Sequence, residues 1–130
     1  MENEFVTYEQ AVKLKELGFN ENCFGWYSDN KDFHLKRNVS IIDINQFSFL
    51  APLKQQVFRW FREVHNSISH IEMSGDKFFW CLLWNEDRQK FTAINRCITY
   101  EEAENKCIDY IISLIKAKFN NLPLSINVNV

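Results

Sequence analysis

The side chains with the clearest capacity for chemistry are the cysteines and histidines, and their spacing limits what they can do. The sequence contains four cysteines and three histidines: Cys23, Cys81, Cys97, Cys107, His34, His65 and His70. No two cysteines form a C-x-x-C pair, and the histidines lie apart from them in the sequence. This spacing is not that of a zinc site. We therefore expect neither a metal nor any other cofactor.

Catalytic arrangements are also incomplete. A nucleophile needs a nearby base and a group that orients the base. Cys97 and His70 could meet in space, but no local signature supports such a dyad. The neighbouring Glu101 and Glu102 fit the start of a helix better than an acid–base pair. The three glycines are scattered, so the chain has no GxGxxG or Walker-type loop. We predict that the protein is not an enzyme.

Length and composition indicate a single globular domain. The 130 residues are 46% hydrophobic and 15% aromatic, which is ample for a core. The net charge of −2 is too balanced for binding duplex DNA by charge alone, and for an acidic mimic of nucleic acid. The polar, acidic beginning MENEFVTYEQ does not resemble a signal peptide, and no apolar run approaches the roughly 20 residues of a membrane span. We expect reduced cysteines, a cytoplasmic location and no membrane partner.

The clearest amphipathic helix lies in residues 50–65, LAPLKQQVFRWFREVH. Pro52 suits the first helical position, where its missing N–H has no partner to lose. At 100° per residue, one apolar stripe forms, consisting of Leu53, Val57, Trp60, Phe61 and Val64. The opposite face carries Gln55, Gln56, Arg59, Arg62 and Glu63, with Phe58 on the flank. The stripe requires a partner surface, most simply a sheet.

The outward face of this helix is the predicted partner-binding surface, formed by Lys54, Phe58, Arg59 and Arg62. Arginine and large aromatics dominate interface energetics, and these residue types gather here. Under the alternative interpretation the face is simply solvated. The contact would then lie in residues 38–48 or on the acidic face of the last helix.

The first third of the chain predicts a helix followed by a hairpin. Thr7 and Gln10 form a capping box for a helix over residues 8–17, which Gly18 ends. Residues 23–27 and 32–37 read as two strands joined by turn residues. Residues 38–48 form either a third short strand or an ordered connection.

The strand over residues 78–84 is apolar on both faces, which predicts a central strand covered on both sides. One face carries Phe78, Trp80, Leu82 and Trp84. Such a row resembles a base-stacking platform, but core packing is the commoner fate of large aromatics. Residues 67–73 and 89–95 are its expected neighbours, with Phe91 and Ala93 pointing inward and Ile94 a further candidate for the inward face.

A second capping box at Thr99 opens the longest helix, which residues 120–123 should end. We therefore predict an α+β fold in which an antiparallel sheet packs against two main helices, residues 52–65 and 100–118, plus a short N-terminal helix. Residues 1–119 form this single domain. Residues 120–130 form a tail, either frayed or a short edge strand.

Four segments have a familiar order: FVTYEQAVKLKELGF, CFGWYSD, LAPLKQQVFRWFRE and TYEEAENKCIDYIISLIK. In this order the chain resembles a group of small, mostly uncharacterised accessory proteins of bacteriophages and prophages. The shared motifs are structural in character and bring no catalytic residue. Residues 38–48 and the tail after Phe119 have no counterpart in the group. The resemblance implies binding of a host protein in the host cytoplasm, including inhibition of a defence nuclease such as an RNA-guided (CRISPR) effector, as an anti-CRISPR protein does.

Two functions are therefore expected, and both are non-enzymatic. The first is binding of a host protein or protein–RNA complex. The alternative is binding of single-stranded nucleic acid by Lys54, Arg59, Arg62 and an exposed aromatic side chain. Phosphate binding would weaken steeply with salt, and this separates the two.

Overall fold

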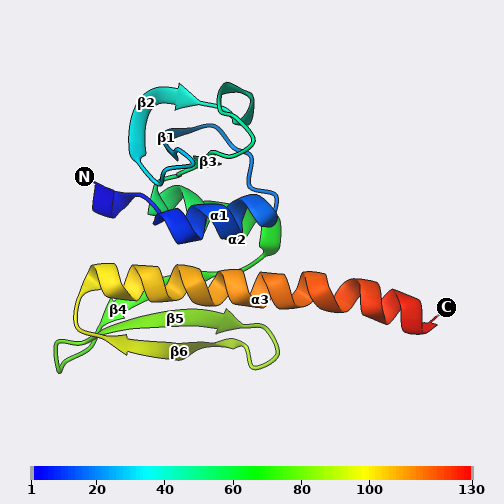
Figure 1. The fold of residues 1–130 in the computed structure, drawn as a ribbon. Helices are drawn as coiled ribbons and strands as arrows, with labels where there is room; N and C mark the ends of the chain where they lie inside the picture. Colours follow the sequence, from blue (N-terminus) through cyan, green and yellow to red (C-terminus); the bar gives the residue numbers. More distant parts are fainter. Residues whose placement is uncertain (1, 130) are drawn as a thin grey trace.

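Two small antiparallel sheets lie on either side of the helices in this computed structural model, which describes residues 2–129 and the side chains of residues 2–120 (Figure 1). The main helices are α1 (Tyr8–Glu16), α2 (Lys54–His65) and α3 (Tyr100–Asn129). The first sheet contains β1 (Cys23–Tyr27), β2 (Phe33–Val39) and β3 (Phe49–Leu50). The second contains β4 (Ser69–Met73), β5 (Phe79–Asn85) and β6 (Lys90–Cys97). The α+β class is confirmed, but the single predicted sheet is two sheets.

Helix α3 occupies the middle of the molecule, with α1 and α2 on one side and the sheet β4–β5–β6 on the other (Figure 1). Its buried apolar residues are Ala103, Cys107, Ile108, Ile111, Ile112 and Ile115. They form a wider apolar surface than one stripe, as a helix packed on two sides requires. Tyr110, on the same helix, is 40% exposed.

Helix α1 begins at Tyr8 as predicted and ends at Glu16, one residue before the predicted end. The Thr7 side chain accepts a hydrogen bond from the Gln10 N–H, and the Gln10 side chain accepts one from the Thr7 N–H. Gly18 then takes a φ of +93°, a left-handed conformation that costs glycine little. The amide of Gln10 also reaches across to α3, where it donates to Asp109 Oδ1 at 3.0 Å. The cap therefore ties α1 to α3.

The predicted hairpin forms the core of the first sheet, whose strand order is β2–β1–β3. Tyr27 donates its hydroxyl hydrogen to the carbonyl of Val6 at 2.8 Å, which fixes the sheet on the chain leading into α1. Residues 38–48 contain the end of β2 and a short 3-10 helix, Ile41–Asp43. They form an ordered connection, and the third strand, β3, follows them.

Helix α2 begins at Lys54, two residues after the predicted start at Pro52. The Val6 N–H donates to the carbonyl of Pro52 at 3.0 Å, and Leu53 forms a β-bridge with Phe5. These contacts hold the chain extended as far as Leu53. The helix ends at His65, and the next residue, Asn66, caps it in a left-handed conformation with φ +53°.

Strand β5 is central, as predicted, and pairs antiparallel with β4 and β6. Its side chains alternate as expected, with Cys81 fully buried against α3. The prediction of cover on both faces is wrong, because α3 packs on one face only and no other described element lies over the second (Figure 1). A bulge in β6 opposite Cys81 turns Ile94 toward the core. Phe91, predicted to point inward, lies on the uncovered face and is 39% exposed.

The helical backbone of α3 continues to Asn129, past the stop predicted at residues 120–123. The short edge strand expected in the tail is therefore absent from the described residues 2–129. A proline inside a helix removes one hydrogen bond and its ring clashes with a preceding carbonyl, but the outcome can be a kink instead of an end, so the signal at Pro123 does not by itself require a stop. Val130 lies outside the described residues.

Candidate interaction surfaces

Two of the four predicted partner-binding residues are buried. Lys54 is 3% exposed and Phe58 is 8% exposed. Lys54 Nζ lies 3.9 Å from Glu104 Oε1 on α3, and burial raises the pKa of the Glu104 carboxyl while Lys54 opposes that rise. Phe58 packs against Phe61 with ring centroids 6.4 Å apart. The outward surface predicted for α2 is wrong at these two positions, because the N-terminal part of α3 covers that side of the helix.

Arg59 and Arg62 are exposed as predicted, but only one of them is paired. Arg59 Nη2 lies 3.7 Å from Glu21 Oε1. Arg62 has no ion-pair partner among the side chains of residues 2–120. The predicted surface is therefore reduced to one guanidinium group on α2, that of Arg62, which has no ion-pair partner among the described side chains.

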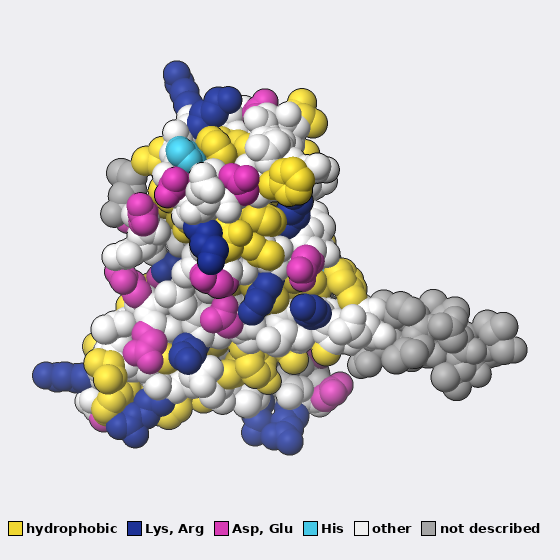
Figure 2. Space-filling model, viewed as in Figure 1, with side chains coloured by type: hydrophobic (Ala, Val, Ile, Leu, Met, Phe, Trp, Pro, Cys, Tyr) yellow, Lys and Arg dark blue, Asp and Glu magenta, His cyan; other side chains and the backbone are white. Residues whose placement is uncertain are grey.

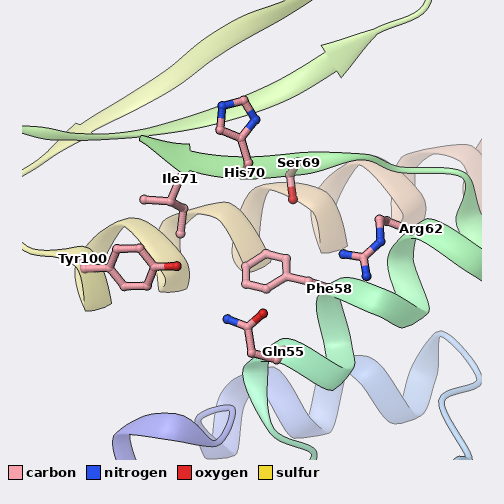
Figure 3. A pocket seen from close by; sticks show the side chains of 7 residues that line it. All are labelled: Gln55, Phe58, Arg62, Ser69, His70, Ile71 and Tyr100. Atoms are coloured by element: carbon pink, nitrogen blue, oxygen red, sulfur yellow. The ribbon is translucent and has the colours of Figure 1, made fainter. Parts of the chain in front are cut away.

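Arg62 lines a cavity of about 200 Å³ between α2, β4 and the start of α3 (Figure 3). The lining residues are Gln55, Phe58, Arg62, Ser69, His70, Ile71 and Tyr100. In Figure 3 the side chains from α2 and the Tyr100 hydroxyl point toward one another across the cavity, whereas His70 projects on the other side of β4. Neutral donors and one cation thus surround an apolar floor, an arrangement suited to a ligand with a carboxylate. We name it the Arg62 pocket.

The uncovered face of the sheet β4–β5–β6 forms a second candidate surface. Strand register places on this outer face Ile68, His70, Glu72, Phe78, Trp80, Leu82, Trp84, Phe91, Ala93 and Arg96. Trp84 packs on Phe91 with centroids 5.2 Å apart, and Phe91 lies 4.6 Å from the His70 ring, both edge-to-face. The guanidinium carbon of Arg96 lies 3.6 Å from the centroid of the Phe78 ring. We call this the outer aromatic face.

Charged side chains surround the outer aromatic face. In Figure 2, Lys and Arg side chains gather along the lower edge of the molecule, where this sheet lies. Exposed cations of the strands and turns are Lys77, Arg88, Lys90 and Arg96. Acidic residues are interspersed with them, and Trp84 donates its indole N–H to Glu86 Oε2 at 2.7 Å. The rim is therefore mixed in charge.

Sequence reasoning identified the aromatic side chains of β5 as one row but placed them in the core. The alternation of Phe78, Trp80, Leu82 and Trp84 was the correct signal for a common face. Nothing in that alternation states whether a second layer covers the face. Phe91 and Ala93 pair with Trp84 and Leu82 and share their face, so their predicted inward placement was wrong for the same reason as that of the β5 row.

The titratable groups do not assemble into a reactive centre among the described side chains. All four cysteines are buried, and none of them forms a disulfide. Burial raises the pKa of the Cys23 and Cys97 thiols. Burial also lowers the pKa of His65, which lines a separate cavity of about 480 Å³ at the C-terminal end of α2. No group of three or more possible metal ligands occurs in the described part of the chain.

The helices in the described range are all too short or too polar to cross a membrane. Searches with the whole chain against protein-family models, curated proteins and solved structures find no match to it.

Proposed function

We propose that the protein acts without turnover, by binding a partner protein through the outer aromatic face. The observation that supports this most directly is a three-stranded sheet with a helix on one face only and two tryptophans on the other. Contiguous exposed apolar surface rimmed by polar groups marks interaction sites. Tryptophan and arginine are also the residue types that most often carry binding energy at protein interfaces.

A protein partner fits this face better than a nucleic acid does. Bases stack on the flat face of an aromatic ring. The rings of His70, Phe91 and Trp84 instead pack edge-to-face against one another, which leaves fewer free ring faces. The chain carries a net charge of −2, and the rim mixes both signs. Non-specific nucleic-acid binding relies on positive charge, so both features favour a protein.

The sequence resemblance suggests which partner to test first. Accessory proteins of phages commonly act on the host, so we propose a host protein in the cytoplasm, and in particular a defence nuclease such as an RNA-guided effector. Binding at the outer aromatic face would then inhibit the nuclease by occupying a surface that it needs. No residue of this chain is required to react in such a mechanism.

Single-stranded nucleic acid is a second candidate. It is favoured by the cations along the lower edge of Figure 2 and by the Arg96 guanidinium over Phe78. Arginine and aromatic side chains together form the grooves that track single strands. In this case affinity should fall linearly with salt on logarithmic axes.

The test uses the double variant Trp80→Ser with Trp84→Ser, and Phe24→Ser as its matched control. Phe24 is an aromatic of the first sheet that is 51% exposed and lies away from the outer aromatic face. The proteins, first shown to fold, would capture partners from host lysate with and without nuclease treatment. We expect a captured protein that survives nuclease treatment and is lost only with the double variant. Capture that survives the double variant would refute the face, and capture abolished by nuclease would favour nucleic acid.

A further inference from the structure

Strand β4 is an edge strand whose outer side has free hydrogen-bonding groups. The sheet order is β4–β5–β6, so only one side of β4 is paired. The Trp84 N–H donates to the Ile68 carbonyl at 2.9 Å, and the Ser74 N–H donates to the Phe78 carbonyl at 2.9 Å. Along an antiparallel pair, every second residue directs its N–H and C=O groups at the neighbouring strand. His70 and Glu72, which lie between Ile68 and Ser74 in this pattern, therefore also direct their backbone groups at β5.

The backbone groups of Ser69, Ile71 and Met73 therefore point away from the sheet. None of their N–H or C=O groups has a hydrogen-bond partner among the described residues. An edge with free donors and acceptors is a template for another strand, and proteins usually blunt such edges with charge, proline or a covering element. On this edge the only charged residue of β4 is Glu72, whose side chain lies on the opposite face from Ser69 and Ile71.

The Arg62 pocket opens beside this edge. Ser69 and Ile71 of the strand line it together with Phe58, Arg62 and Tyr100 (Figure 3). Its lining contains one arginine and no carboxylate. Arg62 has no ion-pair partner among residues 2–120, although Arg59, one turn earlier on the same helix, pairs with Glu21. A guanidinium beside an open strand edge can therefore donate hydrogen bonds to a carboxylate of an incoming chain.

We propose that the β4 edge binds an extended segment of a partner protein as a fourth strand, with an acidic side chain of that segment in the Arg62 pocket. Side chains of an added strand would alternate between the two faces of the sheet. One set would face α3 and the Arg62 pocket, and the other would continue the outer aromatic face next to His70. The inference concerns a second surface, and it holds or fails independently of the function proposed for the outer aromatic face.

A second copy of this chain fits the edge poorly. If β4 of another copy were added, the side chains it placed on the α3 side would be Ser69, Ile71 and Met73. None of them carries a carboxylate, so the guanidinium of Arg62 would remain unpaired. The charge of the Arg62 pocket thus favours a foreign acidic segment over self-association.

The test uses capped heptapeptides that alternate threonine with valine, leucine or phenylalanine and carry one central glutamate, each with a matched glutamine version. Binding would be measured by fluorescence anisotropy up to about 1 mM peptide. Amide hydrogen exchange, followed by NMR, would locate the bound strand. Arg62→Gln is the test variant, and Arg59→Gln is its control on the same helix. Analytical ultracentrifugation of the wild type would detect a second copy.

We expect glutamate peptides to bind roughly tenfold more tightly than glutamine peptides, and Arg62→Gln alone to remove that difference. Bound peptide should slow exchange of the Ser69 and Ile71 amides, while those of His70 and Glu72, already paired with β5, change little. The proposal is overturned by any of three results: no peptide binds, glutamate gives no advantage, or exchange at Ser69 and Ile71 is unchanged. A dimer that protects these same amides would also overturn it, by assigning the edge to a second copy.

Discussion

Replacing Lys54 with methionine should destabilise the protein by about 2–4 kcal/mol near neutral pH. The Lys54 and Glu104 side chains are only 4% and 10% exposed, and the charged atoms lie 3.9 Å apart. Two unit charges at that distance attract by about 4 kcal/mol at an effective dielectric constant near 20. Methionine keeps most of the aliphatic packing but leaves the Glu104 carboxylate without its cation. Removing one partner of a buried pair costs about 3–5 kcal/mol, and protonation of the carboxyl would relieve part of that loss.

The loss of stability caused by Lys54→Met should increase with pH. Burial already raises the pKa of Glu104 above its ordinary value of 4.5, and Lys54 opposes the rise. A carboxyl whose pKa is raised in the folded state loses stability as the pH increases from 4.5 through the raised value. Without Lys54 the pKa rises further, so the destabilisation should be small near pH 4.5 and should grow toward pH 7.

Urea denaturation followed by circular dichroism, at about pH 4.5 and pH 7, measures both quantities. The control is Lys116→Met, which removes an exposed ion pair with Glu16 at 3.6 Å and should cost less than about 0.5 kcal/mol. A loss for Lys54→Met no larger than that of the control would refute the argument from burial. An equal loss at both pH values would show that Glu104 does not carry the effect.

Three further outcomes are expected. Trp80→Ala should lower the free energy of unfolding by only about 1–2 kcal/mol, because one side of the indole is open. Phe61→Ala should lower it by about 3–5 kcal/mol, because that ring is fully buried. Equal urea midpoints for the two variants would contradict this. Gly25→Ala should destabilise the protein by at least about 1 kcal/mol, because an added Cβ would lie 2.8 Å from the Phe33 ring. Gly75→Ala should be near neutral, because the space around Gly75 is open. Thermal melts of both variants measure the difference. Thiol titration should count four free thiols in urea and show slow labelling in the native protein, because all four cysteines are buried; fast native labelling would mean that the core opens readily.

Local signals in the sequence located most of the elements correctly. The capping box at Thr7, the left-handed Gly18 and the alternation of β5 each depend on a few adjacent residues. The start of α2 was displaced by two residues because distant partners hold Pro52 and Leu53 extended. Such contacts between segments far apart in sequence leave no periodic signal.

The candidate surfaces were less predictable than the elements, for the same physical reason. Periodicity placed Lys54 on the solvent side of α2, but Glu104 on α3 provides a buried partner that no local pattern contains. It placed Trp80 in the core because an apolar strand usually has two covers. Arg59 and Arg62 look equivalent in sequence, and only the tertiary structure gives one a partner and leaves the other beside an open strand edge.

The half-buried tryptophans of the outer aromatic face follow from how the chain distributes its helices. Helices α1 and α2 both lie on the side of α3 that faces the first sheet, so α3 alone remains to cover the second sheet (Figure 1). The α3-facing residues already give that sheet a buried side, with Cys81 and Cys97 almost fully enclosed. Trp80 and Trp84 therefore contribute less to the stability of the fold than those enclosed side chains do. Threonine is well suited to a strand position on a solvated face. Threonine at both positions should therefore cost about 1–3 kcal/mol, because each indole loses the part of its surface that is buried. If the variant still folds, a docking face requires that it also loses partner binding, whereas tryptophans that served only the fold would leave binding intact.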